Sequence, residues 1–338
     1  MILRHISLKP WNTFGLDYKA DCLLILKSEQ EVMSFLRNRD QYIDPLLIIG
    51  KGSNILFTSD FTGTILSPAM EGISVEEHYG DKVIVSAEAG VEWDLFVEWC
   101  VGNGYGGVEN LSLIPGKVGA CPIQNIGAYG VEVKDTLLKV TALRIEDGTR
   151  REFSNEECRF GYRNSIFKEE LKGKYLIVKV YFNLTTDMVF NTSYDLLKEE
   201  VSRLGGESLR NIRQAVIDIR RRKLPDPEIT GNAGSFFKNP VVSNKVADNL
   251  RLRYPFMTAY PDKSGGVKLA AAWLIEKCGW KGRRIGDAGV HDRQSLVLIN
   301  YGKATGREIY ELSEIIRKSV FEEFGIWLER EVELIGLT

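Results

Sequence analysis

The stretch GNGYGGVENLSLIPGKVGACPIQNIGAYG, residues 102–130, contains eight glycines and is the most informative segment for the fold. Its first six residues match the Gly-x-Gly-x-x-Gly string of dinucleotide-binding Rossmann domains. In those domains the string follows a strand and opens a helix. Here it follows residues 91–101, which have helical periodicity, and leads into further glycine-rich chain. The context disfavours a Rossmann domain and predicts main chain that wraps closely around a large ligand.

A shorter glycine loop precedes this stretch and is the first glycine loop along the chain; residues 102–130 are the second glycine-rich segment. The apolar run 46–49 reaches Gly50-Lys51-Gly52-Ser53-Asn54 and resumes at residues 55–57. This pattern predicts a strand, a tight loop and another strand. Consecutive main-chain N–H groups in such a loop can bind an anion without a helix behind them.

Hydrophobic periodicity outside these loops predicts a mixture of strands and helices. Alternating apolar residues predict strands over 83–88, 141–145, 150–153, 176–184 and 328–334. Helical spacing predicts helices over 91–101, 209–219, 268–278 and 305–324. We expect Leu95, Phe96 and Trp99 on one face of the first helix, and Gly325 to end the last helix.

Composition limits the classes of protein that this chain can represent. Hydrophobic residues make up 44% of the 338 residues and charged residues 27%, which is typical of a globular protein with two or three domains. The net charge of -2 argues against nucleic acid as a partner. No apolar run approaches the roughly 20 residues of a membrane span, and residues 1–10 do not form a signal peptide. We expect a soluble, cytoplasmic protein.

Cysteines and histidines exclude several kinds of chemistry. The five cysteines are scattered, with no Cys-x-x-Cys pair, which fits free thiols in a reducing compartment. The three histidines, His5, His78 and His291, are far from one another and from the cysteines in sequence. Zinc sites and nucleophilic Ser/His or Cys/His machinery are therefore not expected. If the protein is an enzyme, a bound cofactor is expected to perform the difficult step.

The segment 231–240, Gly-Asn-Ala-Gly-Ser-Phe-Phe-Lys-Asn-Pro, places the hydroxyl of Ser235 between glycine and two aromatic rings. Such a hydroxyl could deliver a proton where the rings exclude water. The alternative is an ordinary turn followed by two core phenylalanines.

Near the C-terminus, Glu329, Glu331 and Glu333 alternate with apolar residues, which by itself indicates a solvent-facing side of a strand.

Six segments, in the same order along the chain, resemble one protein family. They are 50–54, 114–130, 160–165, 223–227, 231–240 and 328–335. The family is UDP-N-acetylenolpyruvoylglucosamine reductase, also called UDP-N-acetylmuramate dehydrogenase, and the resemblance covers nearly the whole chain. The segment around Tyr194 and the extended stretch 240–262 resemble the longer variant of this family.

This resemblance implies an α+β fold. It consists of a two-lobed FAD-binding module of the vanillyl-alcohol-oxidase type and a separate α+β substrate-binding domain. Residues 1–72 and 73–218 would form the two FAD-binding lobes, and residues 219–325 the substrate-binding domain. The C-terminal strand, 326–338, is a candidate to return to the first lobe.

The resemblance also implies FAD as cofactor. Related oxidases often bond the flavin covalently to a histidine in the first glycine loop, and residues 50–54 contain none, so FAD is expected to be noncovalent. The residues assigned to FAD are Gly50, Lys51, Gly52, Ser53, Asn54, Ile114, Pro115, Gly116, Gly119, Ala120, Asn125, Ile126, Gly127 and Tyr129.

The implied reaction assigns three catalytic residues. NADPH, the co-substrate, would reduce FAD, and hydride would then pass to the enolpyruvyl ether of the nucleotide-sugar substrate. Ser235 would protonate the neighbouring carbon, while Arg163 and Glu331 stabilise the developing negative charge. To do so Glu331 must carry a proton, so we expect burial to raise its pKa when substrate is bound. We prefer this role over the solvent-facing interpretation.

The remaining implied residues would bind the substrate. They are Tyr162, Tyr194, Lys223, Asn239, Tyr260, Lys268 and Gln294. The alternative for Tyr194 is an exposed loop tyrosine. NADPH and the nucleotide sugar are expected to use one cavity in turn, in a monomer that contains no metal and binds neither nucleic acid nor membrane.

Two other functions remain open. One is an FAD-dependent oxidase of a sugar or alcohol on the same fold. The missing loop histidine and the presence of Arg163, Ser235 and Glu331 disfavour it. The other is a noncatalytic protein that binds flavin or a nucleotide sugar.

Overall fold

The computed structural model describes residues 1–262 and 265–337, and the contacts of the chain divide it into two compact units. The first unit contains Met1–Ile6, Ala20–Lys51 and Thr62–Arg222. The second contains Ser7–Lys19, Gly52–Phe61 and Lys223–Thr338. The three domains expected from the sequence, with bounds at 72, 218 and 325, are a finer division and stay a prediction.

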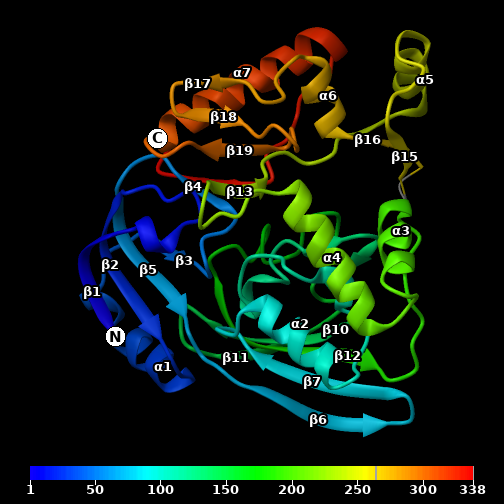
Figure 1. The fold of residues 1–338 in the computed structure, drawn as a ribbon. Helices are drawn as coiled ribbons and strands as arrows, with labels where there is room; N and C mark the ends of the chain where they lie inside the picture. The colour runs from blue at the N-terminus through cyan, green and yellow to red at the C-terminus, as the bar shows by residue number, and fades with distance from the viewer. Residues whose placement is uncertain (263–264, 338) are drawn as a thin grey trace. The chain divides into compact units, whose positions relative to one another are not determined.

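A four-stranded sheet opens the first unit (Figure 1), in the order β1-β2-β5-β3. Its strands are β1 (Ile2–Ser7), β2 (Lys19–Leu26), β5 (Phe61–Pro68) and β3 (Leu46–Ile48), and β3 pairs with β5 in parallel. Helix α1 (Glu29–Arg37) begins at Ser28, whose side chain accepts the N–H of Glu31, and the short helix η2 (Arg39–Gln41) follows. Val32 and Phe35 of α1 are buried in the same core cluster as Leu24 and Leu66 of the sheet.

The larger sheet of the first unit has the order β11-β10-β12-β7-β6, with every neighbouring pair antiparallel. Its strands are β6 (Ile73–Tyr79), β7 (Lys82–Glu88), β10 (Leu137–Arg144), β11 (Arg150–Ser154) and β12 (Tyr175–Thr185). The strands expected at 83–88, 141–145, 150–153 and 176–184 are confirmed. The hairpin between β10 and β11 turns at Asp147-Gly148, where Gly148 has φ 75°.

Helices and short turns cover this sheet. Helix α2 (Trp93–Gly102) lies on the sheet (Figure 1). The centre of the Phe96 ring is 4.5 Å from that of Phe182 on β12. The expected apolar face of α2 is wrong at Leu95, which is 57% exposed. Trp93, Phe96, Val97 and Cys100 form the buried face instead, with Trp99 half-buried at its edge.

The rest of the first unit consists of two helices and several short elements. Helices α3 (Asp195–Arg203) and α4 (Leu209–Lys223) share a small core, and the buried stripe of α4 contains the expected Ile212, Val216 and Ile219. The short elements are η3 (Glu109–Leu111), η4 (Val118–Ala120), β8 (Gly127–Ala128), β9 (Val131–Glu132) and η5 (Val133–Asp135).

The second unit contains three small sheets. Strands β13 (Gly231–Ser235), β19 (Val297–Asn300), β18 (Ala288–Val290) and β17 (Arg284–Ile285) form one sheet in that order. Strands β14 (Val241–Val242), β16 (Val267–Leu269) and β15 (Ala259–Pro261) form another. In the third, β20 (Glu333–Ile335) pairs in parallel with β4 (Ile55–Phe57).

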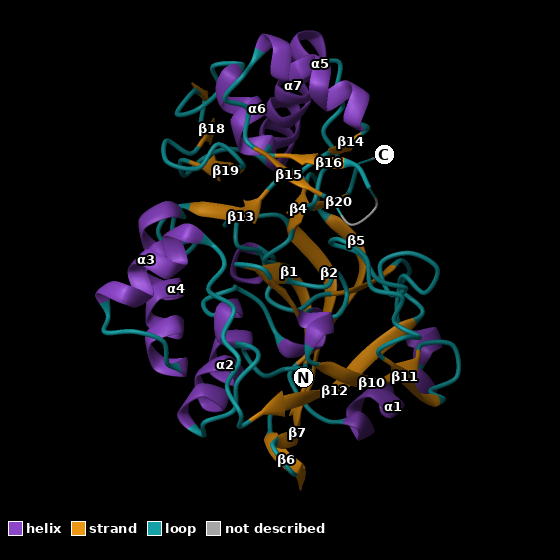
Figure 2. Ribbon diagram, turned by 90° about the vertical axis from the view of Figure 1, so that its right-hand side faces the viewer, coloured by secondary structure: helices purple, strands orange, loops and turns teal. Residues whose placement is uncertain are grey.

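Helix α7 (Gly306–Phe324) packs on α6 (Ala271–Lys277) and on the sheet that contains β18 and β19 (Figure 2). The other helices in the described part of this unit are η1 (Lys9–Trp11) and α5 (Asn244–Arg253).

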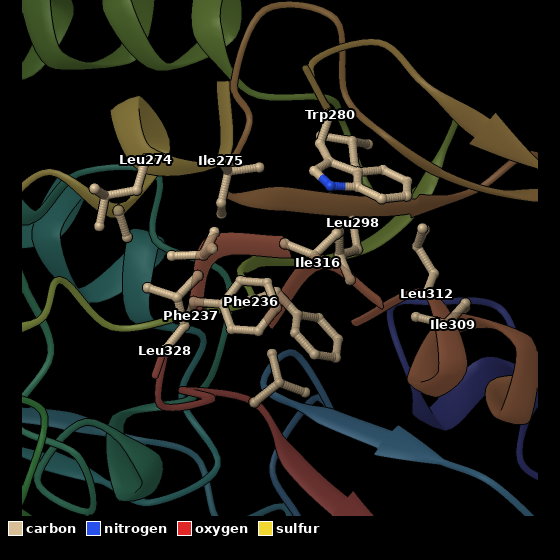
Figure 3. Packing of buried hydrophobic residues seen from close by; sticks show 14 of the residues in the cluster. Phe236, Phe237, Leu274, Ile275, Trp280, Leu298, Ile309, Leu312, Ile316 and Leu328 are labelled. Atoms are coloured by element: carbon tan, nitrogen blue, oxygen red, sulfur yellow. The ribbon is translucent and has the colours of Figure 1, made fainter. Parts of the chain in front are cut away.

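Phe236 and Phe237 lie in the middle of the core of the second unit, as Figure 3 shows, and both are fully buried. Around them pack Leu274, Ile275, Trp280, Leu298, Ile309, Leu312, Ile316 and Leu328.

Two expected elements differ in their bounds. The helix expected over 268–278 begins only at Ala271, because residues 267–269 form the central strand of a sheet, with β14 on one side and β15 on the other. The strand expected over 328–334 is reduced to β20, Glu333–Ile335. Among the described residues, no helix combines the length and apolar character needed to cross a membrane.

The capping box of α7 gives a test of local stability. The Thr305 hydroxyl accepts the N–H of Glu308, and the Glu308 carboxylate accepts the N–H of Thr305. Thr305→Ala is expected to lower the free energy of unfolding by about 1 kcal/mol, because a first-turn N–H loses its acceptor. Urea denaturation measures the change, with Thr258→Ala at an exposed position as control. Equal midpoints for both variants would contradict the prediction.

Candidate active site

The first glycine loop is shaped by contacts with its own chain. Gly52 has φ +64°, and a Cβ at this position would lie only 2.0 Å from the main-chain oxygen of Trp11. The carbonyl of Gly52 accepts the N–H of Thr13 at 3.2 Å. Only glycine fits here, because any side chain would overlap main-chain atoms and strain the left-handed backbone.

Within the first unit, this loop lies beside the second glycine-rich segment. A Cβ built on Gly50 would lie 3.5 Å from the Cβ of Ala120 and 3.7 Å from that of Lys117. Among the residues that the structure describes, the main-chain N–H groups of Gly50, Lys51, Gly116 and Lys117 donate no hydrogen bond to the protein. Two pairs of consecutive N–H donors on adjacent loops form the kind of cradle that binds a diphosphate.

Lys117 adds a cation to this cradle, and the sequence did not single it out. Its ammonium donates to the carbonyl of Pro68 at 3.1 Å. Burial lowers the pKa of Lys117, while Glu92 and Glu71 oppose the shift. A half-buried ammonium beside unpaired N–H groups favours an anionic ligand, so the residues present fit the diphosphate of FAD.

Gly119 has a different reason to be glycine. A Cβ there would lie 2.6 Å from the Cβ of Ala89, and its N–H donates to the Ala89 carbonyl at 3.0 Å. The segment that follows strand β7 therefore packs directly on η4. Packing inside the first unit is enough to require this glycine.

Asn125, Gly127 and Arg163 are brought together in the first unit. Asn125 is completely buried, has φ 45°, and donates from its side chain to the carbonyl of Gly161 at 3.0 Å. Arg163, with φ 53°, donates from Nη2 to the Gly127 carbonyl at 2.6 Å and from Nη1 to the Asn125 carbonyl at 3.3 Å. Its guanidinium also lies 5.4 Å from the centre of the Tyr162 ring. Two expected cofactor residues thus hold the side chain of an expected catalytic residue.

Two further expected site residues of the first unit are in contact. The rings of Tyr129 and Tyr194 meet edge to face, with their centres 5.6 Å apart. Burial raises the pKa of Tyr129, whose φ is 49°. Tyr194 immediately precedes α3 with 42% of its surface exposed, and its substrate-binding role stays a prediction.

An ion pair that the sequence did not predict fixes the main chain at Leu113, in the middle of the glycine-rich segment 102–130. Asp94 on α2 accepts the N–H of Leu113 at 2.5 Å and pairs with Arg213 on α4 at 2.6 Å. Arg220 donates to the Leu113 carbonyl at 3.2 Å. Burial alone would raise the pKa of Asp94, but the hydrogen bonds from Arg213 and Leu113 lower it overall. No sequence pattern links Asp94 to Arg213, which is 119 residues away.

The other expected FAD residues lie in the same two segments. Ser53 and Asn54 are half-buried at the end of the first loop, and Pro115 and Gly116 precede η4. Ile114 and Ile126 pack against the main core cluster of the first unit.

In the second unit, Ser235 is the last residue of β13. The side chain of Asn232 accepts the N–H of Gly234 at 2.9 Å and donates to the carbonyls of Thr230 at 2.8 Å and Pro225 at 3.2 Å. Gly234 then takes a left-handed conformation, φ 68°, and Ser235 follows, half-buried. These bonds fix the main chain that enters Ser235.

The segment that follows Ser235 pairs with the segment that contains Glu331. The Glu331 N–H donates to the Phe236 carbonyl, and the Lys238 N–H to the Glu329 carbonyl, both at 2.9 Å. Phe237 and Arg330 lie opposite one another in this antiparallel bridge. Ser235 and Glu331, about 100 residues apart in sequence, are therefore on neighbouring segments of one unit.

The solvent-facing interpretation of the three glutamates is correct only for the first. The side chain of Glu329 is 72% exposed and pairs with Lys238 at 2.5 Å. Glu331 and Glu333 are half-buried. The difference arises because the chain at 328–332 follows the core, where Leu328 and Val332 are buried, rather than a flat strand.

The remaining expected substrate residues belong mainly to the second unit. The side-chain oxygen of Asn239 accepts the N–H of Ala271 at 2.9 Å, at the start of α6. Tyr260 and Lys268 are partners in the β15–β16 ladder, and the Lys268 ammonium lies 3.6 Å from an Asp262 carboxylate oxygen. Asn239, Tyr260 and Lys268 are thus grouped around β16.

The other two expected substrate residues, Lys223 and Gln294, lie elsewhere along the chain. Lys223 is half-buried at the last position of α4. Gln294 is in the turn before β19, where its side-chain oxygen accepts the N–H of Leu296 at 3.4 Å. Lys223 is thus placed by a helix, and Gln294 by the turn that leads into β19.

Family models match both parts of the chain. A model described as "FAD binding domain" matches residues 20–154, which include both loops of the N–H cradle. The fold and these loops define an FAD-containing oxidoreductase. A second model, described as "UDP-N-acetylenolpyruvoylglucosamine reductase, C-terminal domain", matches residues 226–335.

Whole proteins give the same result. The chain is 49% identical over 332 residues to the UDP-N-acetylenolpyruvoylglucosamine reductase of Pseudomonas putida, with 98% of each chain covered. It is 43% identical over 337 residues to that of Flavobacterium johnsoniae, with 99% of each covered. The solved structure of UDP-N-acetylenolpyruvylglucosamine reductase from Thermus caldophilus matches with a TM-score of 0.68 and 23% identity, covering 99% of this chain and 98% of that one.

This chain belongs to the UDP-N-acetylenolpyruvoylglucosamine reductase family. The expected α+β fold, with an FAD-binding module and a separate substrate-binding domain, is confirmed. FAD as the cofactor is confirmed as well.

Gly52 gives a test of the first loop. Gly52→Ala places a methyl group against the Trp11 carbonyl at a left-handed position, so it is expected to lower the free energy of unfolding by at least about 1–2 kcal/mol and to weaken FAD binding. Gly102→Ala is the matched control, because nothing lies within 4 Å of its Cβ position. Urea denaturation and titration with FAD measure both effects. Equal behaviour of the two variants would show that the close approach at Gly52 is unimportant.

Proposed function

We propose that this protein catalyses the NADPH-dependent reduction of UDP-N-acetylglucosamine enolpyruvate to UDP-N-acetylmuramate, a precursor of peptidoglycan. The observation that carries the proposal is the main-chain pairing at Phe236–Glu331, which brings Ser235 close to Glu331 along neighbouring segments. Identity to reductases over nearly the full chain supports the choice of substrate.

FAD would be held by the N–H cradle at Gly50, Lys51, Gly116 and Lys117. Asn125 and Gly127 would continue the cofactor surface, since their main chain is fixed by Arg163. The chemistry that bound FAD supplies is transfer of hydride from NADPH to the enolpyruvyl double bond. The absence of histidine from the first loop supports noncovalent binding.

Ser235 would donate the proton. Hydride addition to the terminal carbon of the enolpyruvyl group leaves negative charge on the adjacent carbon and its carboxylate. A hydroxyl at the fixed end of β13, followed by the buried rings of Phe236 and Phe237, can deliver a proton to that carbon with little access of water.

Arg163 and Glu331 would stabilise the charge. The Arg163 guanidinium is oriented by the carbonyls of Asn125 and Gly127, and its planar set of donors suits a carboxylate. Glu331 is half-buried, and its main-chain N–H and carbonyl are both hydrogen-bonded, so its backbone is fixed before substrate arrives. In its protonated form it would donate to the same developing charge.

Seven residues are proposed to bind the nucleotide part of the substrate. We assign this role to Tyr162, Tyr194, Lys223, Asn239, Tyr260, Lys268 and Gln294. NADPH would use the same residues in turn, which accounts for a chain without a Rossmann fingerprint in its proper context. We further propose a monomer that acts in the cytoplasm.

An anaerobic experiment in two halves tests the reaction. NADPH is expected to bleach the yellow flavin, and UDP-N-acetylglucosamine enolpyruvate to restore the colour with formation of UDP-N-acetylmuramate. Plain UDP-N-acetylglucosamine is the control, since it has no double bond to accept hydride. Bleaching without recovery would reject the substrate, and bleaching by a sugar or alcohol without NADPH would favour the oxidase.

Ser235→Ala tests the proton donor. The variant is expected to be reduced by NADPH at nearly the normal rate, because that half needs no proton from Ser235. Reoxidation by the enolpyruvyl nucleotide should slow by about 10²–10⁴-fold. Stopped-flow absorbance of the flavin measures both rates, with Ser319→Ala on α7 as control. Equal slowing of both halves would show that Ser235 has no selective role in proton transfer.

A further inference from the structure

Arg330 immediately precedes Glu331, and its side chain is buried against α7. Only 16% of that side chain is exposed. Its Nε donates to the hydroxyl of Ser313 at 3.0 Å, and its guanidinium pairs with the carboxylate of Glu314. The guanidinium carbon also lies 4.9 Å from the centre of the Tyr310 ring. Three residues of one helix therefore hold this cation.

Glu314 binds a second arginine that reaches the same segment. Arg317 donates from Nη1 to Glu314 at 2.6 Å and from Nε to the carbonyl of Leu328 at 2.8 Å. The chain just before Glu331 is thus tied to α7 at two positions, residues 328 and 330. One carboxylate organises both ties.

The main chain of Glu331 is fixed from two other directions. Its N–H donates to the Phe236 carbonyl at 2.9 Å, and its carbonyl accepts from Nδ2 of Asn54 at 3.1 Å. The carbonyl of Asn54 in turn accepts the N–H of Glu333 at 3.0 Å. With Arg330 anchored as well, the Cα of Glu331 has little freedom to move.

The ion pair is a poor explanation for stability alone. The Arg330 side chain is 16% exposed and that of Glu314 is 41% exposed. Taking the guanidinium out of water costs energy, and solvent weakens its attraction to Glu314, so the pair contributes little net stability. Burial lowers the pKa of Arg330, which reflects this cost, although the group stays charged at any working pH. The pair does, however, hold the main chain at Arg330 in one defined position relative to α7.

We infer that Arg330 is a positioning residue: through Ser313 and Glu314 it sets the place of the Glu331 carboxyl relative to Ser235. The inference rests on the proposed role of Glu331 in the oxidative half of the reaction. A displacement of about 1 Å in a catalytic group can reduce the rate by roughly 100-fold, so an anchor beside Glu331 has a measurable effect.

The test uses the FAD-loaded protein and the variant Arg330→Met, which keeps the length of the side chain but removes its charge. Flavin reoxidation by the enolpyruvyl nucleotide is expected to slow by roughly 10- to 100-fold, while reduction by NADPH stays nearly normal. Hydrogen–deuterium exchange of the peptide 328–335 should become faster, which needs no turnover. Ser313→Ala removes one acceptor from Arg330 and should act in the same direction, more weakly.

Two matched variants separate this inference from the proposed function. Glu329→Gln changes an exposed carboxylate on the same segment and should leave both half-reactions and the exchange unchanged. Glu331→Gln should slow reoxidation alone; a normal rate would reject the catalytic role of Glu331 whatever Arg330→Met does. If Glu331→Gln slows reoxidation but Arg330→Met leaves it and the exchange unchanged, or slows both halves equally, the positioning role is overturned. Should Arg330→Met not fold, Ser313→Ala decides by the same readings.

Discussion

The burial of Phe236 and Phe237 is the interaction on which the second unit depends. Their ring centres are 5.3 Å apart, and Phe14 lies 6.3 Å from Phe236. Successive residues of a strand point to opposite faces, so two adjacent core residues require the chain to leave the regular strand. It does so at Ser235, where β13 ends after a register shift. Burying each ring contributes about 1.5–3 kcal/mol, enough to hold Ser235 at that end.

In the first unit, several residues at or near the expected site positions have strained main chain. Leu113, Asn125, Tyr129 and Arg163 all have positive φ, between 45° and 58°. Such conformations cost of order 1–3 kcal/mol each for residues other than glycine. Hydrogen bonds offset the cost: Asp94 and Arg220 bind the peptide groups at Leu113, and Arg163 binds the carbonyl of Asn125. The strain is therefore located where the cofactor and substrate residues are expected, and the geometry exists before any ligand binds.

Local sequence patterns predicted the secondary structure correctly wherever contacts between near neighbours along the chain determine it. The end of α7 at Gly325 is an example, since the left-handed conformation of this glycine depends only on the last turn of the helix. Long-range contacts decide the rest. Lys268 lies in a strand because two other strands flank it, and Asp94 meets Arg213 only after the fold has formed. The six segments of resemblance identified the family, and two of them contain Lys117 and Arg330, but the resemblance assigned neither residue a role.

The glycines of the two glycine-rich segments differ in how closely protein atoms approach them. Gly52 and Gly119 must be glycine because protein atoms approach them, at 2.0 Å and 2.6 Å from a Cβ position. Gly102 and Gly104 have nothing within 4 Å. Glycine content therefore predicts close approach of main chain without saying what approaches. The sharper indication of a ligand is the set of N–H groups at Gly50, Lys51, Gly116 and Lys117 that no protein acceptor within the described residues satisfies. Gly50, Gly116 and Lys117 are half-buried, whereas Lys51 is exposed. Because half-buried N–H groups need acceptors, these three donors indicate a candidate anion site more directly than the glycines do.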